Sequence, residues 1–169
     1  MKFPKLNLKN KGQKGFTLIE LALAMAIGGM IAGAVTMTIF QVVDSSGRTS
    51  NHVTAVRQAQ SAGYWVSKDV QMAQVVTTED DPDGLPLVLN WTEWDGTVNV
   101  VTYSLQGTEL IRDHNGESNP VAQFIESADV SPRPYVGGKL TFTVTVTVGA
   151  GSAAQPETRT YEIIPRPGS

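Results

Sequence analysis

Residues Leu21–Phe40 form a run of twenty residues without a charged side chain. As an α-helix, a run of this length rises by about 30 Å, which is the thickness of the hydrocarbon core of a bilayer. Five lysines precede the run within residues 1–15, and the next basic residue after it is Arg48. The positive-inside rule therefore predicts that the N-terminus is cytoplasmic and that the bulk of the chain lies across the membrane.

Two other interpretations of the apolar run stay open at this point. A helix buried in a soluble domain is usually shorter, and a secretory signal peptide would be cleaved after its apolar segment, for which Ala32–Ala34 offers a small-x-small site. Neither interpretation explains Glu20, a carboxylate at the start of the run, where a charge costs free energy. Glu20 either has a function or only stabilises the first helical turn through the helix dipole.

The segment Lys14–Leu21, KGFTLIEL, resembles the processing site of type IV pilins and of the pseudopilins of type II secretion. In that family a short basic leader ends in glycine, and phenylalanine, a Thr-Leu-Ile stretch, glutamate and a long apolar helix follow. The resemblance implies that a prepilin peptidase cleaves between Gly15 and Phe16 on the cytoplasmic side of the membrane. It also implies methylation of the new amino group of Phe16 and a role for Glu20 in filament assembly.

Cleavage after Gly15 would place a cationic N-terminus four residues before Glu20. We expect Glu20 of one subunit to pair with the N-terminal amino group of a neighbouring subunit, because two half-buried charges are tolerated only as a pair. The family often has a proline in the second half of the apolar helix, whereas this chain has none between Pro4 and Pro82. The glycines of the run are therefore its only expected weak points.

Four segments are expected: a basic leader at 1–15, a membrane or filament-core helix at 16–40, an amphipathic helical continuation at 41–76 and a globular β domain at 77–169. Apolar residues of the continuation recur at spacings of three and four, which predicts one buried helical stripe: Val56, Ala59, Gly63, Val66, Val70 and Ala73. The helix is expected to end at about Val75, and Ser45–Gly47 is a candidate interruption.

Strands are predicted after the breaker Thr77–Pro86. In Lys139–Val148, KLTFTVTVTV, apolar residues alternate with threonines, which predicts a strand with one buried face. Val121–Val130 is either a helical turn or a strand. Shorter strands are predicted at Pro86–Trp91, Val98–Leu105, Glu109–Asp113 and Thr158–Ile164.

The fold class is therefore α+β: a long N-terminal helix, apolar in its front half and amphipathic in its rear half, packed under an antiparallel sheet of four to six strands. This is the pilin-like fold that the resemblance implies. The order of VTYSLQGTELIRD, VAQFIESADV and two long strands, after WVSKDVQMAQ near the end of the helix, is also similar to J-type minor pseudopilins and their minor-pilin counterparts.

The sequence contains no catalytic motif and no cysteine, so we expect neither an enzyme nor a cofactor. His52 and His114 are interpreted as solvated surface residues. Glu79, Asp81 and Asp83 alternate as in the first half of a calcium loop, but no acid stands at the position of the bidentate ligand. This segment is therefore either a weak calcium loop or a solvated loop.

Composition and charge narrow the function. Apolar residues make up 41% of the chain and charged residues 17%, which is typical of a globular protein. Five of the 13 basic residues lie within residues 1–15, so the remainder has eight basic and 16 acidic side chains. A mature chain this acidic is a poor candidate for nucleic-acid binding.

Two functions are compatible with these patterns. The first is a structural minor pilin or pseudopilin subunit of a type IV pilus or type II secretion pseudopilus, with prepilin peptidase, other pilins, the inner membrane and its assembly platform as partners. Such a subunit would leave the inner membrane for a periplasmic or extracellular filament. The second is a tip or surface subunit that binds a secreted substrate or an external ligand, through a surface of Trp91, Trp94 and Tyr103 unless these residues only fill the core and its edges.

Overall fold

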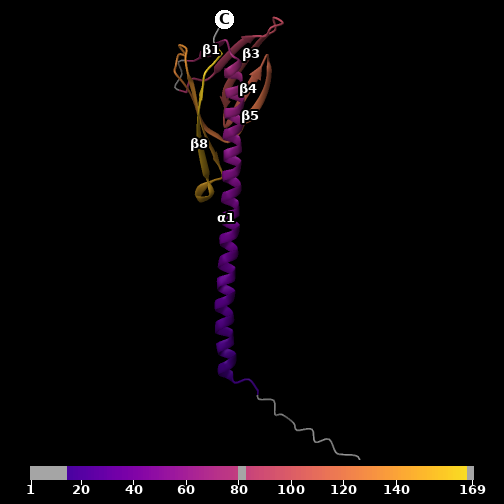
Figure 1. The fold of residues 1–169 in the computed structure, drawn as a ribbon. Helices are drawn as coiled ribbons and strands as arrows, with labels where there is room; N and C mark the ends of the chain where they lie inside the picture. Colours follow the sequence, from indigo (N-terminus) through magenta and orange to yellow (C-terminus); the bar gives the residue numbers. More distant parts are fainter. Residues whose placement is uncertain (1–14, 80–82, 167–169) are drawn as a thin grey trace, which may run out of the picture. The chain divides into compact units, whose positions relative to one another are not determined.

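The computed structural model describes residues 15–79 and 83–166 (Figure 1). One helix, α1 (Leu18–Met72), precedes eight strands and a short 3-10 helix at Gly151–Ala153. The strands are β1 (Val75–Thr78), β2 (Leu87–Thr92), β3 (Val98–Gln106), β4 (Glu109–His114), β5 (Glu117–Ala122), β6 (Ile125–Ser131), β7 (Leu140–Val148) and β8 (Gln155–Ile163). The chain divides into two compact units, unit 1 (Met1–Val43) and unit 2 (Asp44–Ser169). The chain thus has the α+β, pilin-like class of fold.

Helix α1 is assigned without interruption over 55 residues, including Ser45–Gly47. The helix ends at Met72, earlier than the expected end at about Val75. The N–H of Ala73 still donates to the carbonyl of Asp69 at 3.0 Å, whereas that of Gln74 donates to the carbonyl of Asn90 at 2.9 Å. Pairing with β2 then takes over, since Val75 opposes Asn90 in β1. The sequence-based end was wrong because this pairing overrides the helical preference of the segment.

The first sheet is an antiparallel meander in the order β1-β2-β3-β4-β5. Its last strand, β5, is an edge strand that contains Pro120, which has no N–H to offer a further strand. Two polar side chains of α1 form hydrogen bonds with the backbone at the end of β5 and directly after it. Ser61 donates to the carbonyl of Val121 at 2.7 Å, and Gln58 accepts from the N–H of Gln123 at 2.9 Å.

The second sheet is a separate meander in the order β6-β7-β8. The segment Val121–Val130 turned out to be strand at both ends, since β5 ends at Ala122 and β6 begins at Ile125. Between them, Phe124 has a φ of 60°, which is unusual for a residue with a side chain. The expected meander of four to six strands corresponds to the first sheet, whereas the second sheet was not expected, because it forms only where the chain leaves the first sheet at this point.

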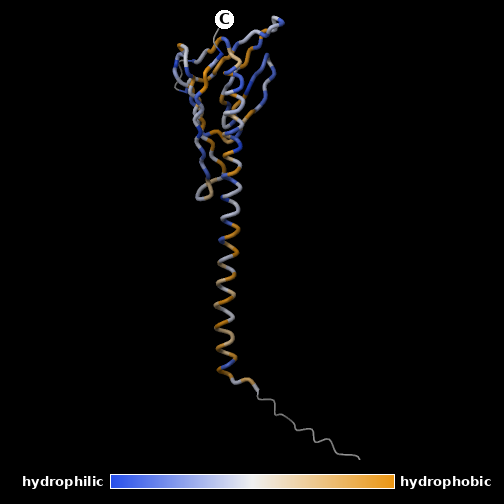
Figure 2. The backbone as a smooth tube through the Cα atoms, in the orientation of Figure 1, coloured by the Kyte–Doolittle hydropathy of each residue, from blue (hydrophilic) through white to orange (hydrophobic). Residues whose placement is uncertain are grey.

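Both sheets and the rear part of α1 contribute to one hydrophobic core in unit 2 (Figure 1). Strand β7 confirms the predicted alternation, because its apolar residues are buried and its threonines are not. Figure 2 shows that apolar residues dominate the front part of α1, whereas apolar and polar residues are mixed over the strands. The buried stripe of α1 consists mainly of small residues, which allow close packing: Ala55, Ala59, Ala62, Gly63, Val66 and Val70.

Gly63 is required for one of these close contacts. A Cβ atom at this position would overlap the ring of Tyr161 from β8. The hydroxyl of Tyr161 donates to the carbonyl of Ala59 at 3.1 Å, one turn earlier in α1. The absence of a side chain at Gly63 therefore lets the tyrosine ring lie directly on the helix.

Candidate processing and assembly site

Helix α1 begins with a capping box formed by Thr17 and Glu20. The carboxylate of Glu20 accepts, through Oε2, from the backbone N–H and from the hydroxyl of Thr17, each at 2.9 Å. In return, the N–H of Glu20 is 3.3 Å from the hydroxyl oxygen of Thr17, a long hydrogen bond. The pattern Thr-x-x-Glu at a helix start satisfies two backbone donors that the helix itself leaves unpaired. Glu20 thus has a local structural role within its own chain.

The cap separates the predicted cleavage site from the helix. Gly15 and Phe16 lie before the first helical residue, and both are exposed, Phe16 to 87%. The bond between them is outside the helical hydrogen-bond pattern, in a segment without regular structure. Oε1 of Glu20 receives no hydrogen bond from residues 15–79 or 83–166, so one carboxylate oxygen has capacity for a further donor.

The apolar part of α1 has no covering protein around it. All residues from Gly15 to Ser50 are exposed, and α1 is long and apolar enough to cross a membrane. Two hydroxyl groups in this part are satisfied within the helix. Thr36 donates to the carbonyl of Ala32 at 2.8 Å and Thr38 to that of Ala34 at 2.9 Å. Such internal bonds remove the cost of placing a hydroxyl in an apolar environment.

A buried polar cluster in unit 2 was not identified from the sequence. Asp69 is 3% exposed and lies in the buried stripe of α1. Its Oδ2 accepts from the hydroxyl of Tyr103 at 2.5 Å and from Nε of Arg112 at 2.6 Å, and its Oδ1 accepts from Nη2 of Arg112 at 3.2 Å. The signal that could have revealed it is an acid at helical spacing between Val66 and Val70, because a buried carboxylate needs partners.

The environment of Asp69 stabilises the neutral form of Tyr103 and the charged form of Arg112. Burial, and then the hydrogen bond to Asp69, raises the pKa of Tyr103 above its usual value, so this phenol stays neutral. The hydrogen bond to Asp69 raises the pKa of Arg112, which keeps its positive charge. Arg112 also lies over the ring of Trp65, 5.2 Å from its centroid, where a cation–π contact adds stability.

The candidate calcium loop is only partly within the described residues. Asp81 lies outside them, Glu79 is exposed, and Oδ1 of Asp83 accepts from the N–H of Leu85 at 3.2 Å. Over 15–79 and 83–166, no group of three or more His, Asp or Glu side chains is placed to hold a metal ion. Nothing in the described part of this segment therefore supports a calcium site.

The two histidines have different environments. His52 is exposed on α1, as expected. His114 is partly buried, contrary to expectation, because its ring stacks on Trp91 at 6.2 Å between centroids. Its Nε2 atom lies 2.9 Å from Oδ1 of Asn99. Because of this stacking, His114 packs against the folded domain and is only partly accessible to solvent.

The three aromatic residues considered as a binding surface do not lie on one surface. Tyr103 is fully buried in the Asp69 cluster and Trp91 is 8% exposed, whereas Trp94 is 98% exposed. Trp94 is thus the one residue of this set that solvent reaches freely.

The comparison with known families agrees with this geometry. A model of the prokaryotic N-terminal methylation motif matches residues 10–36, which include Gly15, Phe16 and Glu20. No curated protein and no solved structure shows significant similarity to the chain. The motif points to a structural subunit and not to an enzyme. The chain therefore carries the N-terminal signal of type IV pilins and pseudopilins, followed by an α+β domain with two antiparallel sheets.

Proposed function

We propose that this protein is the precursor of a minor pilin or pseudopilin, cleaved between Gly15 and Phe16 by a prepilin peptidase and methylated on Phe16. The methylation motif at residues 10–36 carries the proposal. The position of the helix cap supports it, because cleavage before Phe16 removes the lysines and leaves the Thr17–Glu20 capping box intact. The mature subunit stays anchored in the cytoplasmic membrane by α1 until it enters a pilus or pseudopilus.

The helix start gives Glu20 its role in assembly. The N-terminus of a helix carries partial positive charge, so the new cation at Phe16 lies in an unfavourable field unless a carboxylate is near. Glu20 is that carboxylate, and its Oε1 atom has capacity left after the bonds from Thr17. In a bundle of subunits, Glu20 of one copy pairs with the N-terminal amino group of the next, which sets the axial register of the helices.

Mass spectrometry of the protein from membranes tests the processing step. The expected mature chain begins at Phe16 and carries one methyl group on its α-amine. A mature chain that begins at any other residue would contradict the proposal, as would cleavage within Ala32–Ala34. A Gly15→Leu variant is expected to keep the leader and stay in the membrane, because the signal is intact except at the bond to be cut.

Two Glu20 substitutions separate the local role from the role in assembly. Glu20→Gln keeps a side chain that can cap the helix, since glutamine also serves at this position of a capping box, but it removes the charge. Glu20→Ala removes both. If the charge pairs with a neighbouring subunit, both variants insert into the membrane and neither enters filaments. Filament entry by Glu20→Gln alone would show that only the cap matters.

A second candidate function is ligand binding by unit 2. Trp94 favours it, because its side chain is 98% exposed and aromatic residues are enriched at binding surfaces. A Trp94→Ala variant that enters filaments normally but loses the activity of the filament would support this function. Normal activity of that variant would exclude a role of Trp94 in binding.

A further inference from the structure

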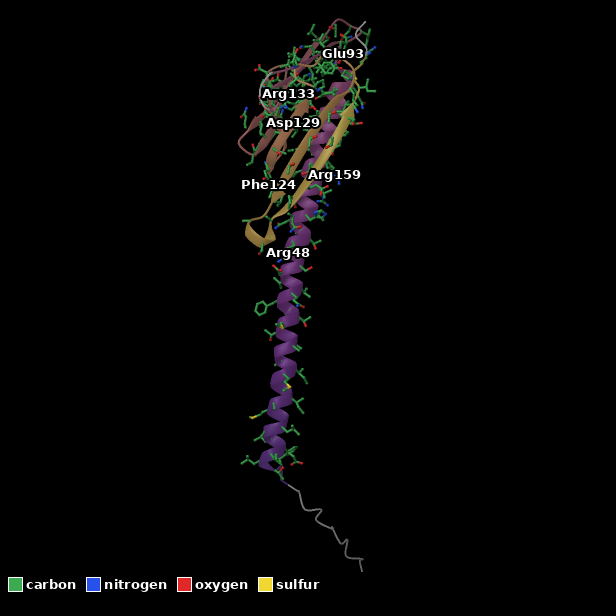
Figure 3. All side chains as sticks on the ribbon, turned by 90° about the vertical axis from the view of Figure 1, so that its left-hand side faces the viewer. Arg48, Glu93, Phe124, Asp129, Arg133 and Arg159 are labelled. Carbon is green, nitrogen blue, oxygen red and sulfur yellow. The ribbon has the colours of Figure 1, made fainter. Side chains whose placement is uncertain are left out.

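The rear part of α1 exposes one side of the helix to solvent. We call this side the outer face of α1; its residues recur at spacings of three and four and are all exposed: Val53, Arg57, Gln60, Tyr64, Lys68 and Gln71. It lies opposite the buried stripe, since Val66 follows Arg57 by about two and a half turns. Arg48 and Glu93 lie at opposite ends of unit 2 (Figure 3), and the outer face extends over about 27 Å between these ends.

The outer face carries positive charge only. Arg57 and Lys68 are its charged residues, and in the described part of the chain neither forms an ion pair. Between residue 45 and the end of α1 the single acid is Asp69, which is buried and bonded within its own cluster. Arg48 lies about two and a half turns before Arg57, on the other side of the helix, and already forms an ion pair. No carboxylate of α1 therefore neutralises the outer face.

Two aromatic side chains hold the middle of the outer face in position. The ring of Trp65 meets that of Tyr64 edge-on, at 5.6 Å between centroids and an interplanar angle of 76°. Nζ of Lys68 lies 5.2 Å from the centroid of the Trp65 ring, a cation–π contact. Tyr64 itself is 61% exposed. Tyrosine, tryptophan and arginine are enriched among the residues that dominate binding in protein interfaces, so this composition favours a protein partner.

Arg57 borders a cleft of about 360 Å³ between α1 and the chain at the end of β5. Its guanidinium is the only charged group in the lining. Two further polar groups of the lining are already bonded, since Ser61 donates to Val121 and Gln58 accepts from Gln123. A guanidinium binds a carboxylate through two parallel N–H donors. The cleft therefore has room for an acidic side chain and one unpaired cation to bind it.

A second copy of this chain does not fit the outer face. The sheets pack on the other side of α1 in unit 2, so the outer face is the side at which a neighbouring helix can pack. The outer face of a second copy presents cations and no carboxylate, whatever the axial offset between the two helices. Like charges that face each other across an interface exclude the wrong partner. A nucleic acid is also disfavoured, because after residue 15 the chain has 16 acidic and eight basic side chains.

We propose that the outer face of α1 binds a different subunit of the same filament, whose facing helix is acidic. One carboxylate of that helix enters the cleft and pairs with Arg57, and a second pairs with Nζ of Lys68. On a parallel helix these two acids stand about eleven positions apart, with apolar side chains between them that pack on Tyr64. The inference rests on the proposed function and deepens it, because it names the neighbour at this face as an acidic helix and not a copy of the chain.

Energy transfer between two labelled populations of the full chain, in phosphatidylcholine vesicles, tests this selectivity. The chain has no cysteine, so Ser152→Cys, at an exposed position between β7 and β8, provides a single labelling site. The acidic probe is the chain itself with Arg57→Glu and Lys68→Glu, because its outer face carries two carboxylates at the required spacing. The wild type should associate with this probe at least about tenfold more tightly than with itself at about 50 mM salt. At about 500 mM salt the difference should fall below about twofold.

Two controls locate the effect on the outer face. Arg48→Glu with Lys139→Glu makes the same change in net charge at residues outside this face, and should not tighten association with the wild type. Tyr64→Ala in both chains should weaken the mixed pair at least about threefold, through lost packing. Each variant is first checked for wild-type unfolding of unit 2, which is expected because the substituted residues are exposed.

Three results would overturn the proposal. Association of the wild type with itself as tightly as with the probe would assign the outer face to a second copy. Equal tightening by the Arg48 and Lys139 control would show that only net charge matters. Loss of the difference when phosphatidylglycerol replaces about a third of the lipid would assign the face to anionic lipid. None of these results affects the start of the mature chain at Phe16, so failure here is distinguishable from failure of the proposed function.

Discussion

The two units contain parts of the same helix, but apolar residues are exposed in one and buried in the other. In the described part of unit 1, every residue of α1 is exposed, including Leu18 at 86% and Phe40 at 70%. In unit 2, small apolar residues of α1 such as Ala59 and Val66 are fully buried. The difference follows from the pattern: an apolar surface all around a helix needs lipid or other helices, whereas a single stripe needs one sheet or two.

A second difference lies in how each unit accommodates a carboxylate. Glu20 in unit 1 is exposed, and its Oε2 atom accepts from Thr17, three positions earlier and directly before the helix. Asp69 in unit 2 is buried and satisfied by strands that lie 34 and 43 positions away in sequence. The first arrangement depends on local sequence alone, and the second exists only when unit 2 is folded. The variants described next are designed to separate these two kinds of interaction.

The largest effect is expected for Asp69→Ala. This substitution leaves Arg112 without its carboxylate in a largely buried site, which costs about 3–5 kcal/mol of the free energy of unfolding. Denaturant unfolding of the full chain, followed by the fluorescence of Trp65 and Trp91, measures it. Asp44→Ala is the matched control, because Asp44 forms an exposed pair with Arg48 at 3.0 Å that contributes less than about 0.5 kcal/mol. Equal effects of the two substitutions would contradict the burial argument.

Gly63→Ala should have the next largest effect. The added Cβ would overlap the ring of Tyr161, so the ring or the helix must move, at a cost of about 1–3 kcal/mol in unit 2. Gly47→Ala is the control, since nothing lies within 4 Å of a Cβ at that position. We expect Gly47→Ala to stabilise slightly, because alanine favours a helix by about 1 kcal/mol over glycine. A neutral Gly63→Ala would mean that the ring does not lie on the helix.

Alkaline pH should destabilise unit 2 through Tyr103. Its pKa is raised in the folded chain, while an unfolded tyrosine ionises at about pH 10. The stabilisation is therefore complete below pH 10 and decreases above it, by about 1.4 kcal/mol for each pH unit. Burial also raises the pKa of Tyr161, so that residue acts in the same direction.

The matching measurement is the unfolding free energy of the wild type and of Tyr103→Phe between pH 8 and pH 11. The variant should be less stable than the wild type at pH 8 but should lose stability less steeply above pH 10. Parallel pH profiles for the two proteins would show that Tyr103 does not ionise with unfolding.

The smallest effect is expected for Thr17→Ala at the start of α1. The loss of the N-cap costs about 1 kcal/mol, but only within the first turn. Hydrogen exchange of the amides of Glu20 and Leu21, which donate to Thr17, should accelerate by about fivefold. The unfolding of unit 2 should not change, in contrast to Asp69→Ala. A changed stability of unit 2 would contradict the local character of the cap.

The sequence predicted the parts of the fold that have a local cause. The alternation in β7 was readable because each threonine stands between two apolar residues, and the helical stripe was readable from its spacing. The break between the two sheets could not be predicted from the sequence, because it depends on tertiary hydrogen bonds. The N–H of Ile125 donates to Thr108 and the N–H of Thr147 to Phe124, and no local pattern encodes these contacts.

The candidate site shows the same limit. The KGFTLIEL motif indicates Gly15, Phe16 and Glu20 as candidate residues, because residues that are close in sequence form the signal. The Asp69 cluster joins residues from α1, β3 and β4, so its geometry requires the folded domain. The exposure of Trp94 could also not be predicted from the sequence, since Trp91, three residues earlier, is buried.

The edge strand β5 affects whether the folded domain aggregates at high local concentration. An unpaired sheet edge can recruit strands from other molecules, which leads to aggregation. Here Pro120 removes one donor, and the side chains of Ser61 and Gln58 occupy the neighbouring carbonyl and N–H groups. Where many copies are held at high local concentration, an incoming strand therefore finds few free N–H and carbonyl groups at this edge of the sheet. Strand addition and amyloid-like growth are therefore disfavoured at this edge.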